Sequence, residues 1–184
     1  MQNYETFRLK YIPFHVKYTE DIFKLHSNPL VHTYLQNNMI STIEEAENIV
    51  QGVIRQYQDL KIGRYLVLEK TTSEFIGWCG LKFNTLEING HKNYHDIGYR
   101  FLPKYWNKGY ASESARFFVE LGYNNFGLSK IYATAECENK ASVKVLQKCG
   151  LKIVETFEYH QKSTYWFEGS NPSKELNKTE GFLE

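Results

Sequence analysis

The stretch from Leu102 to Ser112 (LPKYWNKGYAS) has the residue types of an anion-binding loop. A β-type run ends there, a short loop with one glycine follows, and a helix begins with small residues. The free N–H groups of a first helical turn and the helix dipole together favour a phosphate or pyrophosphate. Gly109 permits close backbone approach, and Ala111 leaves room for the anion. Many strand–turn–helix junctions share these features and bind nothing, so the pattern alone leaves both interpretations open.

The strand that leads into this loop carries an acidic residue. In YHDIGYRFL (94–102), alternation places Tyr94, Asp96, Gly98 and Arg100 on one face. An aspartate on such a strand can pair with a neighbouring arginine or cap a turn.

A mixed α/β fold must position these residues. Period-2 runs predict strands, and apolar residues at helical spacing predict helices, one of them opened by a capping box of Thr42 and Glu45. The strand–helix–strand order around 94–137 requires a crossover and therefore a parallel pair. The predicted strands cover 7–12, 65–69, 75–83, 94–102, 130–137, 153–160 and 164–168, and the predicted helices cover 19–26, 43–61, 111–124 and 142–149.

Composition excludes several classes of protein. The 184 residues suit one domain, and 42% apolar with 23% charged residues suits a folded core. A formal net charge of +1 predicts no nucleic-acid or anionic-membrane partner, despite an aromatic content of 16%. The apolar runs are too short to span a bilayer and the start lacks a signal-peptide pattern, so we expect a cytoplasmic protein.

The cysteines and histidines indicate neither a disulfide framework nor a metal centre. Cys79, Cys137 and Cys149 are widely spaced and odd in number, which predicts unpaired thiols. His91 and His95 lie close together where a loop enters a strand, and solvent-facing histidines explain them more simply than metal ligands do. We therefore expect no metal.

Two segments together resemble a known family. IGYRFLPKYWNKGYASESA (97–115) resembles the acyl-CoA signature of the GNAT N-acetyltransferase superfamily. It is most similar to the ribosomal-protein N-terminal (alanine) acetyltransferase-like branch, in which Trp-x-x-Gly-x-Ala replaces the commoner Gln/Arg-x-x-Gly-x-Gly/Ala. ENKAS (138–142) and LQKCGL (146–151) resemble that branch's second motif. The resemblance covers about residues 5–168, so we expect a domain over 1–168 and a polar tail over 169–184.

The resemblance implies one GNAT-like domain of mixed α/β (α+β) class. Its central twisted sheet is mixed but mostly antiparallel, with about seven strands flanked by about four helices. The fourth strand (94–102) and the fifth (130–136) are expected to splay apart and to hold the pantetheine arm of the cofactor between them.

Acetyl-CoA is the implied co-substrate. Backbone amides in the loop and first helical turn are expected to hold its pyrophosphate, and the end of the fourth strand is expected to pair with pantetheine. The implied cofactor-binding residues are Phe101, Leu102, Trp106, Asn107, Lys108, Gly109, Tyr110, Ala111, Ser112, Asn139 and Ser142.

The implied reaction is direct attack of a primary amine on acetyl-CoA in a ternary complex. Asp96 is the candidate general base, at a position where the branch usually carries the longer Glu. Many relatives protonate the leaving thiolate with a Tyr that corresponds to Leu146 here. Ser142 is the candidate substitute, although a serine at this place also caps or packs a helix.

The amine acceptor is least defined. In the superfamily it is bound by segments that correspond to 27–41 and 85–94, where His32, Tyr34 and Tyr94 are candidate contacts. Few acids occur there, which favours a neutral or weakly charged amine such as a peptide N-terminus or a small metabolite. The alternative function is a non-catalytic acyl-CoA-binding or sensing domain, and the protein is expected to be a monomer or a homodimer.

Overall fold

The computed structural model describes residues 1–35 and 38–174. Eight strands form one sheet in the order β1-β2-β3-β4-β5-β6-β8-β7. The β5–β6 pair is parallel, and every other neighbouring pair is antiparallel. The strands are β1 (Tyr4–Glu5), β2 (Leu9–Pro13), β3 (Arg64–Glu69), β4 (Phe75–Asn84), β5 (Tyr94–Phe101), β6 (Lys130–Glu136), β7 (Lys152–Tyr159) and β8 (Lys162–Ser170).

Helices cover both faces of this sheet, and each face has its own apolar cluster. Helices α1 and α2 bury Ile22 and Val50 on one face, and α3 and α4 bury Phe118 and Leu146 on the other. Because side chains alternate along a strand, β4 contributes Trp78 to the cluster under α1 and α2 and Cys79 to the cluster under α3 and α4. The helices are α1 (Thr19–His26), α2 (Ile43–Leu60), α3 (Tyr110–Asn124) and α4 (Lys140–Lys148), and short 3₁₀ turns cover Val16–Tyr18, Pro29–His32 and Pro103–Tyr105.

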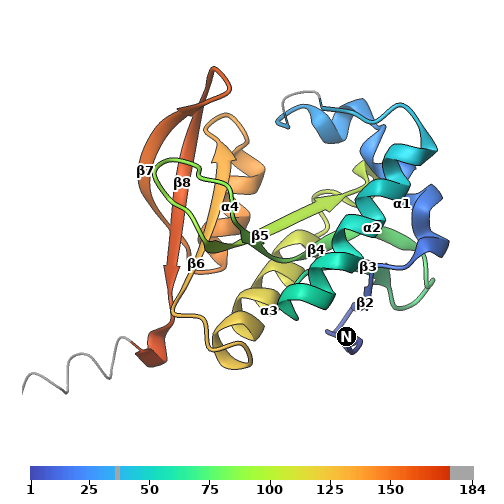
Figure 1. The fold of residues 1–184 in the computed structure, drawn as a ribbon, viewed down its shortest axis with the longest axis horizontal. Helices are drawn as coiled ribbons and strands as arrows, with labels where there is room; N and C mark the ends of the chain where they lie inside the picture. The colour runs from blue at the N-terminus through green and yellow to red at the C-terminus, as the bar shows by residue number, and fades with distance from the viewer. Residues whose placement is uncertain (36–37, 175–184) are drawn as a thin grey trace, which may run out of the picture.

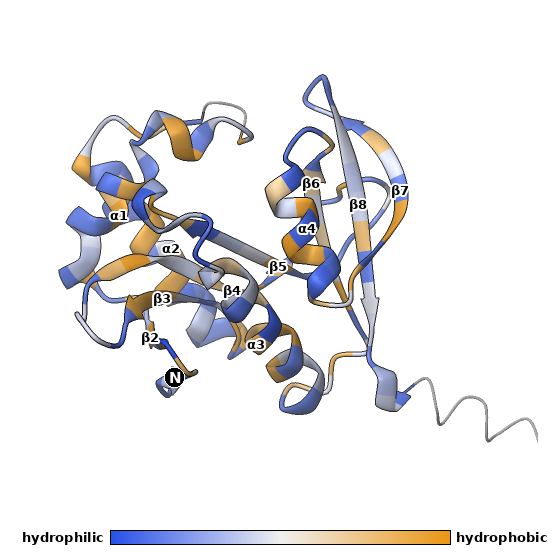
Figure 2. Cartoon of the chain, turned by 180° about the vertical axis from the view of Figure 1, so that it is seen from behind, coloured by the Kyte–Doolittle hydropathy of each residue, from blue (hydrophilic) through white to orange (hydrophobic). Residues whose placement is uncertain are grey.

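Strands β5 and β6 meet at one point and then diverge. The register pairs one residue of each strand, Asp96 with Tyr132, whereas β5 pairs with β4 along its whole length. Figures 1 and 2 show β6, β8 and β7, together with α4, turned away from the part of the sheet that α1 and α2 cover. The splayed, mostly antiparallel sheet predicted from the sequence is confirmed.

Two details of the fold differ from the sequence-based expectation. β1 was not predicted, because a two-residue strand is too short to show alternation. α4 begins at Lys140 rather than at Ser142, because the side chain of Asn139 caps it by accepting a hydrogen bond from the Ser142 N–H (3.1 Å). The capping box predicted for α2 is present.

The chain remains packed against the domain beyond residue 168. β8 continues to Ser170, and Asn171 is buried, with its Nδ2 donating to the carbonyls of Tyr123 (3.2 Å) and Leu128 (3.1 Å). Residues 175–184 of the expected tail lie outside the described residues.

The three cysteines are unpaired, as predicted, and Cys79 is buried. Among residues 1–35 and 38–174, no helix combines the length and the apolarity needed to span a lipid bilayer.

Candidate active site

The loop before α3 presents unpaired backbone donors. Asn107 and Gly109 adopt left-handed φ values of 59° and 81°, which turn the chain into the helix. The first hydrogen bond of the helix runs from the Glu113 N–H to the Gly109 carbonyl (3.0 Å). The N–H groups of residues 110–112 therefore find no acceptor among the described residues, as is normal for a helix start. This is the geometry that an anion requires.

Arg8 holds this loop in place. Its Nε lies 2.7 Å from Oε2 of Glu113, and its Nη1 donates to the carbonyl of Lys108 (2.8 Å). The guanidinium also stacks on the ring of Tyr110, 4.5 Å from the centroid. Arg8 could not be predicted from the sequence, because it lies 100 residues from the loop that it holds and no local pattern marks it.

Aromatic side chains anchor the rest of the loop. The hydroxyls of Tyr105 and Tyr110 donate to Glu74 and Glu69, which lie at the ends of the β3–β4 turn. Trp106 donates from Nε1 to the carbonyl of Phe101 (2.7 Å), while 43% of the residue stays exposed. These three hydrogen bonds hold the loop against the sheet, and none of them requires a bound ligand.

The edge of β5 that faces β6 carries free backbone groups. The Leu102 N–H donates to the Ile76 carbonyl on β4 (3.0 Å), and bonded residues alternate along an antiparallel pair. The N–H groups of Tyr99 and Phe101 therefore point away from β4, into the gap left by β6. Both backbone groups of Leu102 are engaged, because its carbonyl accepts from the Tyr105 N–H (2.9 Å).

The start of α4 faces the same gap from the other side. Tyr99 reaches from β5 to Ser142, and their hydroxyl oxygens lie 2.9 Å apart. The Tyr99 hydroxyl also lies 3.2 Å from the Ser142 carbonyl, and burial raises the pKa of this tyrosine. Leu146, one turn further on, is buried in the core cluster. The hydroxyl groups of Tyr99 and Ser142 therefore bridge the gap between β5 and the start of α4.

Asp96 lies at the point where β5 and β6 separate. Its Oδ1 is buried and has no hydrogen-bond partner among the described residues. Burial raises the pKa of its carboxyl group, and the nearby Arg64 and Lys82 counter part of that rise. A carboxyl group with a raised pKa and an unused oxygen is suited to taking up a proton.

Residues 8–152 match the family model described as an acetyltransferase (GNAT) domain. The chain belongs to the GNAT acetyltransferase family.

Relatives of this GNAT protein agree in fold and in type of reaction. It is 30% identical over 149 residues to YoaA of Bacillus subtilis (strain 168), named as an uncharacterised N-acetyltransferase, with 79% of this chain and 82% of the relative covered. A spermidine N-acetyltransferase of Vibrio cholerae, solved with CoA and spermine, superposes with a TM-score of 0.74 at 19% identity, covering 94% of this chain and 100% of that one. A ribosomal L7/L12 alpha-N-protein acetyltransferase in complex with coenzyme A gives 0.74 at 18% identity, covering 92% and 98%. This chain is therefore an N-acetyltransferase.

The acceptor residues expected for this GNAT protein lie in different surroundings. His32 is 1% exposed, with its Nε2 3.5 Å from Nη1 of Arg100. Tyr34 is 37% exposed. Tyr94 is buried and packs edge-on against Tyr132 and Trp166, with centroids 5.5 and 5.2 Å away. His32 thus lies beside the polar face of β5, whereas Tyr94 helps to fasten β5 to β6 and β8.

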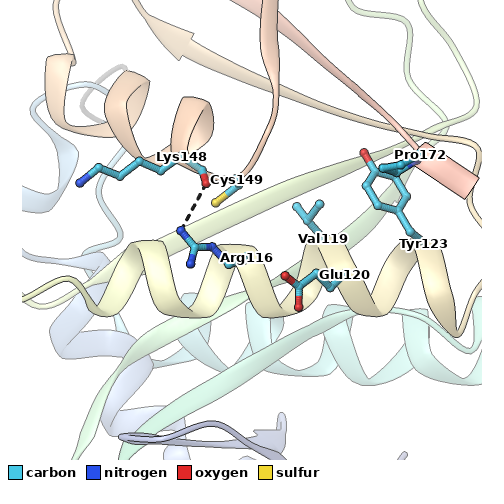
Figure 3. A pocket seen from close by; sticks show the side chains of 7 residues that line it. All are labelled: Arg116, Val119, Glu120, Tyr123, Lys148, Cys149 and Pro172. Atoms are coloured by element: carbon cyan, nitrogen blue, oxygen red, sulfur yellow. Dashed lines mark hydrogen bonds between the residues drawn. The ribbon is translucent and has the colours of Figure 1, made fainter.

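A hollow of about 260 Å³ in this GNAT protein lies away from these groups (Figure 3). It opens between the middle of α3 and the end of α4, where Arg116 donates to the carbonyl of Lys148 (3.5 Å). Residues 116–123 of α3 lie roughly 9–20 Å along the helix axis from its first turn. The α3 residues of the hollow therefore lie further along the helix than the loop, while Cys149, which also lines the hollow, brings its Sγ to 4.0 Å from the Ser112 carbonyl. Its lining residues are Arg116, Val119, Glu120, Tyr123, Lys148, Cys149 and Pro172.

Proposed function

We propose that this enzyme binds acetyl-CoA with its pyrophosphate at the start of α3 and its pantetheine arm between β5 and β6. It then acetylates a primary amine by direct attack within a ternary complex. One observation carries the proposal: beyond the point where β5 and β6 separate, the free edge of β5 leads to the loop and helix start that carry the unpaired N–H groups of residues 110–112. The unpaired N–H groups suit a pyrophosphate, and the free edge suits an amide-containing chain that pairs as a strand would.

The pantetheine arm pairs with Tyr99 and with the N–H of Phe101 in this proposal. Leu102, which the sequence suggested for this role, has both backbone groups engaged within the protein. In the same proposal, the N–H of Tyr99 donates to the oxygen that becomes negative when the amine attacks the thioester. Asn139 contributes by capping α4 and so fixing Ser142 at the edge of the gap.

The two halves of the reaction lie on opposite faces of β5. Asp96 projects from one face, and Tyr99, three residues later, projects from the other. The amine approaches on the Asp96 side and passes its proton to the carboxylate, directly or through one water, as the new C–N bond forms. The C–S bond then breaks, and the thiolate leaves toward Ser142, which donates a hydrogen bond to it.

Tyr99 positions the serine hydroxyl. A tyrosine hydroxyl has one proton, and when Tyr99 gives it to Oγ of Ser142 the serine proton is free for the sulfur. We expect Ser142→Ala to lower kcat by about tenfold, the usual cost of one lost hydrogen bond to a charged group. Tyr99→Phe should lower kcat by a similar factor. The double variant should be no worse than either single one, because both act through the same proton.

Steady-state kinetics on these three variants, with acetyl-CoA affinity measured in parallel, checks this pair. Additive losses in the double variant would contradict the relay. A leaving thiol of low pKa provides a second readout, since acetyl groups on better leaving thiols should lose less from Ser142→Ala.

Hydrogen exchange tests the placement of the cofactor directly. On addition of acetyl-CoA, we expect slower exchange for the amides of Tyr99 and Phe101 and for residues 110–112, with no change along the exposed face of α2. Protection confined to other segments, such as the hollow beside Arg116, would overturn the placement.

A further inference from the structure

A cationic cluster lies on the face of β5 that carries Asp96. Arg64 of β3 and Arg100 of β5 flank the ring of Trp78, with their guanidinium carbons 4.5 and 5.6 Å from its centroid. The guanidinium of Arg64 crosses β4 to reach β5, where a Cβ at Gly98 would lie in ordinary contact with it, 3.5 Å from its Nη2.

The two arginines lack acidic partners. Neither forms a salt bridge with the described residues, and the Nε of each is buried without a hydrogen-bond acceptor. Asp96 is the one carboxylate that acts on Arg64, and Lys82 competes for it from the opposing position on β4. Arg64 and Lys82 thus share this carboxylate, and no carboxylate of the described residues acts on Arg100. Each arginine as a residue is half-buried rather than fully enclosed.

The polar groups around the two arginines offer few acceptors. Trp78 donates from Nε1 to Nε2 of His26 (3.1 Å), so a neutral His26 keeps its proton on Nδ1. That nitrogen lies 2.9 Å from Nη1 of Arg100, which also can only donate. Burial lowers the pKa of His26 to about 3, and it lowers the pKa of His32 as well, so neither histidine adds charge. Nε2 of His32 offers Arg100 one long contact (3.5 Å), and the Nε of each arginine still has no acceptor among the described residues.

We propose that the acceptor amine carries an anionic group, a carboxylate or a phosphate, which binds to Arg64 and Arg100. The proposal rests on the proposed function and names the class of its acceptor. An anion supplies the oxygens that these donors lack, and guanidinium groups bind planar or tetrahedral oxyanions through paired hydrogen bonds. The same cluster repels polycationic amines.

The spacing along β5 fits this assignment. Asp96 and Gly98 lie on one face of the strand, about 7 Å apart at 3.4 Å per residue. An amine next to Asp96 and an anion over Gly98 would then belong to one small molecule, in which several bonds separate the two groups. The acceptor is thus a compact zwitterion rather than a polyamine.

Matched pairs of amines test the proposal. We expect γ-aminobutyrate to exceed butylamine, and O-phosphoethanolamine to exceed ethanolamine, by about tenfold or more in kcat/KM in at least one pair. The pair with the larger ratio identifies the carboxylate or the phosphate. Spermidine should be acetylated less well than either anionic amine. Equal rates within both pairs, or a preference for spermidine, would overturn the anionic acceptor and leave the acetyltransferase function intact.

Two variants assign the preference to the cluster. Arg100→Gln should reduce the ratio within the preferred pair to about one while acetyl-CoA affinity stays unchanged, and Arg100→Lys should retain part of it. Arg55→Gln, on the exposed face of α2, makes the same change in net charge and should keep the full ratio. A full ratio in Arg100→Gln would overturn the assignment.

Butyrate and ethyl phosphate, which are γ-aminobutyrate and O-phosphoethanolamine without the amino group, report on the anion site without any acetyl transfer. At least one of them should bind to the enzyme–CoA complex, and that binding should be lost in Arg100→Gln and retained in Arg55→Gln. Binding of either anion together with no turnover of any amine would contradict the proposed function alone. Turnover with binding of neither anion, or with equal binding to both variants, would contradict the anion site alone.

Discussion

Asp96→Asn is expected to lower kcat by about 100-fold while leaving acetyl-CoA affinity within about twofold of the wild type. Asparagine keeps the size of the side chain but cannot accept a proton. The affinity should persist because Asp96 projects from the face of β5 opposite to the start of α4. Steady-state kinetics and calorimetric titration with acetyl-CoA measure the two quantities.

The pH profile of the same variant distinguishes a base from a structural carboxylate. A base must be deprotonated, so kcat of the wild type should fall as the pH drops through the pKa of Asp96. Burial raises this pKa, so the fall should lie above the ordinary aspartate value of about 3.9. In Asp96→Asn this limb should vanish, and the rate should rise steadily with the unprotonated fraction of the amine. An identical profile in both proteins would return Asp96 to a structural role.

Gly109→Val is expected to raise the dissociation constant of acetyl-CoA by about tenfold or more. Gly109 has a φ of 81°, in the left-handed region that a β-branched residue avoids. A Cβ there would lie 3.4 Å from Nη2 of Arg8, the side chain that fixes the loop. Strain and crowding together would shift the N–H groups of residues 110–112 out of alignment. Titration with acetyl-CoA measures the effect.

Gly127→Val is the matched control for this change. Gly127 also has a positive φ, 62°, but it lies in the α3–β6 connection, with open space around its Cβ position. The Gly127→Val variant should lose about as much stability as Gly109→Val and should keep the wild-type affinity for acetyl-CoA. Equal affinity in Gly109→Val and in wild type would remove the loop from the cofactor site.

Much of the fold was predictable, because periodicity reports which side of an element is buried. The strands around Leu66 and Ile97 and the helix that buries Phe118 have clear period-2 or helical patterns, and each is present. The parallel β5–β6 pair followed from the strand–helix–strand order. β1 was missed because its stability comes from pairing with β2 rather than from any pattern of its own.

The site was predictable only where it depends on one continuous stretch. The loop before α3 could be predicted because a glycine and small residues stand next to each other in the chain. Two contacts join residues from distant parts of the chain, and no spacing in the sequence marks them. They are the hydrogen bond from Arg8 to the Lys108 carbonyl and the contact between Tyr99 and Ser142.

The cationic cluster shows the same limit most clearly. Arg64 stands at the first residue of β3, just before the apolar run that predicted the strand, and its side chain lies on the sheet rather than in a loop. The scarcity of acids in the acceptor segments 27–41 and 85–94 predicted a neutral or weakly charged amine. The face of β5 between those loops carries the charge that bears on the acceptor.

Amine-dependent release of CoA tests the central claim most directly. The purified protein is incubated with acetyl-CoA and, separately, with γ-aminobutyrate, O-phosphoethanolamine, spermidine and a peptide with a free N-terminus, and thiol release and acetylated amine are measured in the same sample. We predict release that depends on the amine, with one acetylated product formed per CoA. Tight acetyl-CoA binding without amine-dependent release across the panel would contradict catalysis and favour a domain that only binds acyl-CoA.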